Sequence, residues 1–368
     1  MTAVIKIPNS EKVFGGEEVF FIAEIGKNFI QTEDECSVEV YLDNARRLVD
    51  AAVEAGADAV KFQTHEVEDE VLNIDFTSPH FKARDRFSWV SRNTAATPLE
   101  AFWQPLKAYC TEKNILFFST PMSRKAAQKL DQVGVPFWKV GSGDVQDHVL
   151  MSYLIRTKKP IIISTGMVSL GELDDVVTHV TAADSPLVVL YCISEYPCPP
   201  EKFNLGTLEH LREKYPQVVV GFSDHSITHD AALAAMKLGA RVIEKHFSFS
   251  RDLWGADHKV SLTPEEFKEM VQAAHSGAYR NVDTQAFYGS KEKELEGANN
   301  QFRPFFNKAL MAGCEIPVDT VITEEMVYAM RPVSLAGGLP ANMLHKVVGK
   351  KAVHSLKRFD PITEESIT

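Results

Sequence analysis

The chain of 368 residues lacks the features of membrane, secreted and nucleic-acid-binding proteins. It has no run of about 18 apolar residues, which a membrane-spanning helix needs, and its N-terminus has no apolar stretch of signal-peptide length. Its five cysteines are odd in number and form no CxxC pair, which favours a reducing compartment over a disulfide framework. The formal net charge of −11 argues against nucleic acid as a main partner. We therefore expect a soluble, cytoplasmic protein that binds neither nucleic acid nor membrane.

The sequence does contain a regular alternation of apolar, β-branched runs with amphipathic segments. Eight such runs occur, at Val19–Ile25, Ala59–Gln63, Ile115–Ser119, Phe137–Gly141, Ile161–Ser164, Leu187–Cys192, Val218–Phe222 and Arg241–His246. Nearly continuous apolar strands alternating with helices imply a parallel sheet that helices cover on the outside. Eight such units indicate an α/β fold of the (β/α)8 TIM-barrel type, with an open doubly wound sheet as the competing arrangement.

The alternation stops after Ala274, which predicts a division into domains. Residues 1–285 are predicted to form the TIM-barrel catalytic domain, and the polar residues 286–304 a linker. Residues 305–368 are predicted to form a small, mostly β-rich second domain with a short helix over Glu324–Met330. Within the barrel, residues 69–97 are expected to be one long polar loop, and long loops at that face of a barrel are usually functional.

Two histidines follow neighbouring strands of the predicted barrel. His225 ends the stretch Gly221-Phe-Ser-Asp-His225, and His246 ends Ile243-Glu-Lys-His246. Parallel neighbours bring two such rings close enough to share one divalent metal ion. Each ring could instead be an ordinary buried histidine. The repeated placement, together with nearby Asp224 and Glu244, favours the metal site.

Other polar residues gather where the strands end, which is the face at which TIM barrels carry their catalytic groups. They are Glu24, Lys61, Gln63, Thr120, Lys139, Ser142, Ser164, Ser194, Tyr196 and Ser223, with Asp257 shortly after the last strand. Two lysines with several hydroxyls and glycine turns suit a phosphate or a carboxylate.

Each of these features has a structural alternative. Any one hydroxyl can be a helix N-cap, and either lysine can pair with an internal carboxylate such as Glu24. The acidic run 66–70 can be a solvated face of a loop.

Nine short motifs occur in order along the barrel and together resemble the sialic acid synthase family, of the N-acetylneuraminate synthase type. They are Ala23-Glu-Ile-Gly26, Lys61-Phe-Gln-Thr-His65, Phe118-Ser-Thr-Pro121, Lys139-Val-Gly-Ser-Gly143, Ser164-Thr-Gly166, Ser194-Glu-Tyr-Pro197, Phe222-Ser-Asp-His225, Glu244-Lys-His246 and Asp257-His258. The residues after 305, with Arg331-Pro332 and Val348-Gly-Lys350, resemble the antifreeze-like SAF domain of that family.

This resemblance implies a reaction and a role for each site residue. Such enzymes condense phosphoenolpyruvate with an open-chain 2-acetamido sugar aldehyde, giving a nine-carbon 2-keto acid and phosphate. The ligands of a Mn²⁺ or Mg²⁺ ion fall on His225 and His246, and Glu24, Lys61 and Lys139 are the expected catalytic residues. Positions that bind phosphoenolpyruvate fall on Lys61, Thr120, Lys139, Ser142, Ser164, Ser194 and Ser223, and positions that bind the sugar on Gln63, Tyr196, Asp257 and Arg331.

The resemblance also implies a domain-swapped homodimer, in which Arg331 reaches from the SAF domain into the partner's active site. The sequence departs from the family pattern at Phe29, Gln31, Asn307-Lys308-Ala309 and Val333. These departures spare the metal and phosphate positions and affect the wall that faces the sugar.

The stretch from Gln63 to Glu70 looks like that of true sialic acid synthases, so an acceptor of the N-acetylmannosamine type is expected. Precursors of legionaminic or pseudaminic acid are the next alternatives. Two alternative functions also remain: a synthase that acts on a shorter sugar phosphate, and a carbohydrate-binding protein of the same fold without catalytic activity. A second, Arg-rich phosphate site would favour the sugar phosphate, and the strand ends supply no such cluster.

Overall fold

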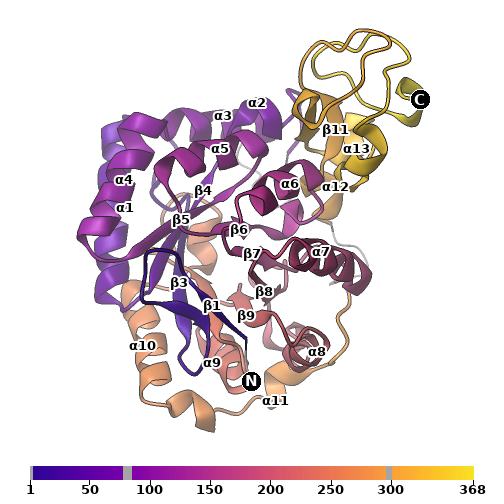
Figure 1. The fold of residues 1–368 in the computed structure, drawn as a ribbon. Coiled ribbons are helices and arrows are strands. Elements are labelled where there is room, and N and C mark those ends of the chain that lie inside the picture. The colour runs from indigo at the N-terminus through magenta and orange to yellow at the C-terminus, as the bar shows by residue number, and fades with distance from the viewer. Residues whose placement is uncertain (1–2, 78–84, 296–300) are drawn as a thin grey trace.

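In the computed structural model, which describes residues 3–77, 85–295 and 301–368, eight parallel strands form one sheet with the order β5-β4-β3-β10-β9-β8-β7-β6. The strands are β3 (Phe20–Gly26), β4 (Ala59–Thr64), β5 (Leu116–Pro121), β6 (Trp138–Val140), β7 (Ile161–Ser164), β8 (Leu187–Cys192), β9 (Val219–Asp224) and β10 (Val242–His246). The end strands β5 and β6 contact each other, so the sheet curls into a nearly closed barrel (Figure 1). The TIM barrel is confirmed, and the open sheet is wrong.

Helices cover the outside of the barrel, and their first residues explain where several of them begin. They are α1 (Val38–Glu54), α4 (Gln104–Glu112), α5 (Arg124–Val133), α6 (His148–Arg156), α7 (Leu170–Ala182), α8 (Thr207–Lys214), α9 (Asp230–Lys237) and α10 (Pro264–His275). The side chains of Ser37, Ser123, Asp147, Ser169 and Thr263 accept backbone N–H groups in the first turns of α1, α5, α6, α7 and α10. Because Ser123 and Ser169 cap α5 and α7, the hydroxyls of Thr120 and Ser164 do not serve as these caps.

The stretch 69–97 is not one long loop, which corrects the sequence-based expectation. It contains the end of the short helix α2 (Val67–Glu70) and all of α3 (Arg86–Ala96); its residues 78–84 lie outside the described part of the chain. The buried face of α3 includes Arg92, whose guanidinium donates to the carbonyls of Glu33 and Asp34 at 2.6 and 2.7 Å. A helix that buries polar groups gives no clear apolar periodicity, so the pattern in the sequence missed it.

One end of the barrel is covered by the chain, and the other is open. An N-terminal hairpin of β1 (Val4–Lys6) and β2 (Val13–Gly15), which the sequence did not predict, covers the amino ends of the strands. Its fully buried Phe14 packs against Phe20 and Phe137 with ring centroids 4.8 and 4.9 Å apart. The candidate site lies at the opposite end, where the strands have their carboxyl ends.

The C-terminal residues form a small unit with its own apolar core, at the upper right of Figure 1. It contains the antiparallel pair β11 (Ala309–Ala312) and β12 (Val327–Met330) and the short helices α13 (Val333–Ala336) and α14 (Leu344–Val347). The helix expected over Glu324–Met330 is wrong, because only a 3-10 turn at Glu324–Met326 precedes β12. The segment expected as a linker carries most of α11 (Gln285–Tyr288) and the start of α12 (Arg303–Phe306). The SAF assignment and the domain limits stay predictions.

None of the helices in the described ranges combines the length and the apolar character that crossing a bilayer requires.

The close packing inside the barrel generates a prediction about stability. A Cβ atom added at Gly221 would lie 2.3 Å from the carbonyl oxygen of Val242 and 2.7 Å from a methyl group of Leu190. We expect Gly221→Ala to lower the free energy of unfolding by about 1–3 kcal/mol, measured by chemical denaturation. Gly171→Ala in α7 is the matched control, because an added Cβ meets nothing within 4 Å there. Equal stability of the two variants would contradict the expectation.

Candidate active site

The alternation of side chains along each strand decides which polar groups meet inside the barrel. On β10, Glu244 and His246 line the pocket at the carboxyl end, as alternate residues on one face of a strand do. Lys245 between them is fully buried elsewhere, and its ammonium group lies 3.0 Å from Asp224 and donates to the Ser226 carbonyl at 2.6 Å. The sequence placed both Asp224 and Glu244 near the histidines, but only Glu244 lines the pocket.

The pocket at the carboxyl ends of the strands has an empty volume of about 840 Å³, including its open mouth. The predicted site residues that line it are Glu24, Lys61, Gln63, Thr120, Lys139, Ser142, Ser164, Tyr196, Ser223, His225, His246, Asp257 and Arg331. Ser194 is the exception: it is buried and is not among the residues that line the pocket. One pocket therefore collects every predicted site residue but one, and the substrate roles of these residues stay predictions.

Four buried charges lie at the centre of the pocket. The Lys61 ammonium is 2.8 Å from a carboxylate oxygen of Glu24 and 3.5 Å from one of Glu244. The Lys139 ammonium is 3.7 Å from the same oxygen of Glu244. The alternative in which a lysine pairs with Glu24 is thus correct for Lys61, yet both ammonium groups also line the pocket. Pairing offsets the several kcal/mol that an isolated buried ion would cost. Burial opposes the charge of both lysines: Glu24 and Glu244 still raise the pKa of Lys61, whereas the pKa of Lys139 is lowered although Glu244 opposes the effect of burial.

The hydroxyl groups around these charges bind the lysines and Glu244. The Lys61 ammonium lies 3.3 Å from the Thr120 hydroxyl, and Lys139 donates to Ser164 at 2.7 Å. Ser223 donates to Glu244 at 3.1 Å. These hydroxyls and ammonium groups are the donors that an anion in the pocket would find.

Burial affects the two carboxyl groups of the cluster differently. It raises the pKa of Glu24 well above its usual range; Lys61 opposes this rise and the negative charge of Glu244 adds to it. Burial acts in the same direction on Glu244, but Lys139 and Lys61 outweigh it and lower the pKa of Glu244 below its usual range. Glu24 is therefore the member of the cluster suited to take up or release a proton near neutral pH.

The two histidines lie together, with ring centroids 5.6 Å apart. His225 Nδ1 is 2.6 Å from the Ile193 carbonyl, a contact that places the ring proton on Nδ1 and leaves the Nε2 lone pair for a ligand. Burial and the neighbouring His246 lower the pKa of His225 to about 3, so the ring stays neutral, as a metal ligand must be. The His225 ring thus fits a divalent ion, and the His246 ring lies beside it in the same pocket. Among the described residues no set of three or more His, Cys, Asp or Glu surrounds one point, so other ligands would come from substrate or water.

Tyr196 lies over the histidine pair. Its ring centroid is 4.1 Å from that of His225 and 6.3 Å from that of His246. On its other side it meets the edge of Phe302 at 6.3 Å. Tyr196 therefore lies between the two histidines and the segment that leads to the C-terminal unit.

Arg331 comes from the end of β12 and lines the pocket of its own chain. Its guanidinium is buried and paired with Asp144, and its backbone N–H donates to the Glu70 carbonyl at 2.9 Å. The domain-swapped homodimer, in which Arg331 enters the partner's active site, stays a prediction.

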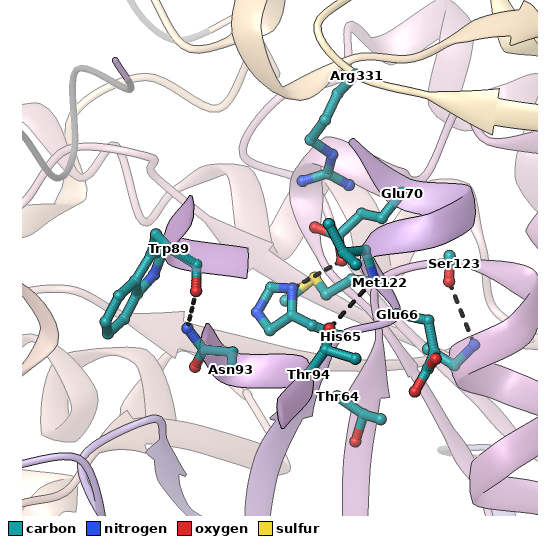
Figure 2. Close-up of polar contacts among 12 residues, drawn as sticks. Thr64, His65, Glu66, Glu70, Trp89, Asn93, Thr94, Met122, Ser123 and Arg331 are labelled. Atoms are coloured by element: carbon teal, nitrogen blue, oxygen red, sulfur yellow. Dashed lines mark hydrogen bonds and ion pairs between the residues drawn. The ribbon is translucent and has the colours of Figure 1, made fainter. Parts of the chain in front are cut away.

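Behind this part of the wall, His65 and Glu70 form a buried pair (Figure 2). His65 Nδ1 lies 2.7 Å from Glu70, whose other oxygen is 3.5 Å from Arg86. Burial lowers the pKa of His65 to about 4. Burial would raise the pKa of Glu70, but His65, Arg331 and Arg86 together lower it to about 2. The acidic run 66–70 is therefore not a solvated face, because Asp69 and Glu70 are buried.

The sequence reasoning missed part of the pocket. The unpredicted side chains that line it are those of Lys27, Arg86, Met122, Asp144, Met167, Cys192, Phe302 and Phe306. Lys27 directly follows β3, so its position at a strand end was a usable signal. Arg86 belongs to α3. Phe302 lies in the segment expected as a linker and Phe306 at the start of the predicted second domain, and nothing in the sequence marks a pocket at either place.

Comparison with known proteins places these features in a family. Residues 48–283 match the model of the NeuB family. The chain is 32% identical over 335 residues to the spore coat polysaccharide biosynthesis protein SpsE of Bacillus subtilis, covering 87% of this chain and 86% of that protein. The crystal structure of SpsE superposes with a TM-score of 0.80 at 30% identity, covering 100% of this chain and 99% of that one.

Two relatives with more specific names are similar over nearly the whole chain. The N-acetylneuraminate-9-phosphate synthase of Homo sapiens is 29% identical over 359 residues, covering 96% of this chain and 94% of that protein. A pseudaminic acid synthase of Campylobacter jejuni is 31% identical over 352 residues, covering 95% and 96%. Since the family model matches more than half of the chain and the similarity to SpsE spans both proteins, the chain belongs to the NeuB family.

Proposed function

We propose that this transferase condenses phosphoenolpyruvate with an open-chain 2-acetamido sugar of the N-acetylmannosamine type, forming a nine-carbon 2-keto acid and phosphate. The observation that carries the proposal is one pocket that holds two buried lysines, a carboxyl group with a raised pKa and two imidazoles, of which that of His225 has a lowered pKa. Family membership and the names of the relatives support a synthase of this class.

The lysine end of the pocket suits phosphoenolpyruvate. The phosphate and carboxylate of that substrate would take over Lys61 and Lys139 from their carboxylate partners, with Thr120 and Ser164 as further hydrogen-bond donors. Gly166 keeps this end open, because a side chain there would collide with the hydroxyls of Ser194 and Ser142.

The reaction itself then needs few groups from the protein. C3 of phosphoenolpyruvate attacks the aldehyde carbon, which leaves an oxocarbenium ion at C2. Water adds at C2, and cleavage of the C2–O bond releases phosphate and forms the ketone. Glu24 lines the pocket and has the raised pKa that a group needs to accept the proton of this water near neutral pH.

The imidazoles of His225 and His246 would hold the Mn²⁺ or Mg²⁺ ion. Bound there, the ion supplies Lewis-acid polarisation of the aldehyde. The carbonyl of Ile193 fixes the orientation of the His225 ring, and Tyr196 packs on its face. The two rings are thus held ready before substrate binds.

The sugar would extend toward Gln63, Tyr196, Asp257 and Arg331. Gln63 donates one N–H to Glu24 at 2.9 Å, so its amide oxygen can accept a sugar hydroxyl.

One observation favours a second candidate acceptor, a phosphorylated acetamido sugar. Lys27 and Arg86 line the same pocket as Arg331, and together they supply the second cationic cluster that the strand ends alone lack. Precursors of legionaminic and pseudaminic acid are further candidates.

An assay with a panel of acceptors tests the proposed function. Purified protein with phosphoenolpyruvate and Mn²⁺ or Mg²⁺ is given N-acetylmannosamine, its 6-phosphate, or the diacetamido sugars that precede legionaminic and pseudaminic acid. We expect equal amounts of phosphate and 2-keto acid with at least one acceptor, and most rapidly with N-acetylmannosamine. Absence of phosphate release with every acceptor would refute the synthase.

A second prediction concerns the histidine pair. We expect His225→Ala and His246→Ala each to abolish turnover and to weaken Mn²⁺ binding, measured by calorimetry, because each removes one of two protein ligands. His258→Ala is the matched control: His258 is also buried, but bonds Ser248 at 2.6 Å outside the pocket lining. Unchanged Mn²⁺ affinity in both site variants would show that the metal lies elsewhere.

A further inference from the structure

We propose that the far end of the acceptor, opposite its aldehyde, enters a side chamber lined by Trp89 and Gly255, and that Lys27 there selects acceptors with an oxygen on the terminal carbon. That oxygen belongs to a hydroxyl or to a phosphate, and both accept a hydrogen bond from an ammonium group. The inference rests on the proposed function, because the acceptor is the open-chain sugar of that reaction. Lys27 thereby determines which sugars the enzyme uses.

The side chamber adjoins the active-site pocket and has an empty volume of about 350 Å³, including its open part. Lys27, Arg86 and Asp257 line both cavities, so the chamber opens from the pocket at these three side chains. Trp89 and Gly255 line only the chamber. A substrate held in the pocket can therefore extend past Asp257 into the chamber.

The direction of the acceptor follows from the groups that bind the two reacting molecules. Lys61 and Lys139 bind phosphoenolpyruvate, and the imidazoles of His225 and His246 face the aldehyde. The far end of an extended acceptor points away from both pairs. The side chamber continues the pocket in such a direction, on the side of Lys27.

The backbone of Gly26 leaves open the space between the centre of the pocket and the chamber. A Cβ atom at this residue would lie 3.1 Å from a carboxylate oxygen of Glu24, 3.2 Å from the amide nitrogen of Gln63 and 3.6 Å from a carboxylate oxygen of Asp257. Its φ of +54° also favours glycine. The proposed proton acceptor and two proposed sugar contacts thus surround one point, directly before Lys27 in the chain. The acceptor therefore has an open path from the reacting carbons to Lys27.

A local irregularity in β3 turns the Lys27 side chain into the cavity. Lys27 lies three positions after Glu24, so a regular strand would place the two side chains on opposite faces. The register of β3 with β4 instead shifts between Glu24 and Gly26, as at a β-bulge. Directly after the shift, the N–H of Asn28 donates to the Ile25 carbonyl at 2.8 Å and closes a turn. Lys27 therefore lines the same cavity as Glu24.

Buried hydrogen bonds hold this turn in place. The side-chain amide of Asn28 donates to the Phe247 carbonyl at 2.9 Å and to the Ser261 hydroxyl at 3.0 Å. Ser261 in turn donates to the Asp257 carbonyl at 2.7 Å. The turn that carries Lys27 and the segment that carries Asp257 are thus joined, so both charged groups are positioned before a substrate binds.

The charges where the two cavities meet suit an oxygen that accepts hydrogen bonds. Burial lowers the pKa of Lys27; the negative charge of Asp257 opposes this effect, and the positive charge of Arg86 adds to it. The two cations therefore repel each other at the entrance of the chamber. A hydroxyl or phosphate oxygen placed there reduces this repulsion, whereas a methyl group does not.

The chamber also has an apolar wall, which suits the carbon chain of a sugar. The Lys27 ammonium lies 5.8 Å from the centroid of the Trp89 ring. Trp254 packs edge-on against that ring with centroids 5.5 Å apart, and Asn93 donates to the Trp89 carbonyl at 2.7 Å (Figure 2). The indole is thus fixed beside the ammonium group, and a terminal carbon that carries oxygen can contact both.

Three acceptors and one substitution test the role of Lys27. N-acetylmannosamine, its 6-deoxy analogue and its 6-phosphate are given to the wild-type protein and to Lys27→Met, and phosphate release is measured. We expect the wild type to have a kcat/KM for N-acetylmannosamine about tenfold or more above that for the 6-deoxy analogue, because the analogue loses a hydrogen bond to a charged group. Lys27→Met keeps the length of the side chain without its charge, so this ratio should fall to about one while the KM for phosphoenolpyruvate changes little.

Lys259→Met is the matched control, because Lys259 is exposed on the segment that carries Asp257 and lines neither cavity. This variant should keep the wild-type ratio. Lys27→Arg keeps the positive charge and should keep a preference for the terminal oxygen. Circular dichroism checks that each variant is folded.

The possible results separate the role of Lys27 from the proposed function. A wild type that releases no phosphate with any acceptor of the full panel would refute the synthase itself. Equal use of the 6-deoxy analogue by an active wild type, or an unchanged ratio in Lys27→Met, would refute only the role of Lys27. The same holds if an active wild type uses neither N-acetylmannosamine nor its 6-phosphate. If Lys27→Met loses more activity with the 6-phosphate than with N-acetylmannosamine, the terminal group is a phosphate; otherwise it is a hydroxyl.

Discussion

The pocket depends on the neutralisation of two buried lysines by two buried carboxylates that come from β3, β4, β6 and β10. Without an anion bound, Glu24 and Glu244 supply the negative charges that offset the burial of the two ammonium groups. An anion that takes over the lysines affects the two carboxylates unequally. Glu244 keeps the hydrogen bond from Ser223, whereas Glu24 keeps only the amide of Gln63. Binding and proton affinity are therefore coupled at Glu24, the residue suited to handle the proton in the proposed reaction.

The sequence predicted this centre well because period-two alternation and the barrel topology together determine it. Lys61 and Lys139 stand inside apolar strands, where a charge needs a partner, and the strand ends of a parallel barrel meet at one face. His225 and His246 follow adjacent strands for the same reason. The same alternation explains why Asp224, which the sequence suggested for the site, does not line the pocket. Asp224 and Lys245 lie on the other face of their strands and form an ion pair there.

The parts that the sequence did not predict depend on contacts between distant segments. Arg86 of α3 lies beside Glu70 of α2. The buried face of α3 contains polar side chains, so the sequence there lacks the apolar periodicity that predicts a helix. Phe302 reaches the pocket from the segment expected as a linker, and Phe306 from the start of the predicted second domain. The docking of the C-terminal unit rests on Lys308 between Asp144 and Asp147, separated from them by about half the chain, and no local pattern indicates such a contact.

The pocket therefore has two ends with different origins. The lysine and histidine end consists of strand-end residues of one barrel, so the fold alone is enough to assemble it. The end with Arg331, Arg86 and Phe306 exists only where a helix outside the eight-unit pattern and a separate unit meet. Buried ion pairs attach that end to the barrel, so a change in its side chains need not move the lysines and imidazoles.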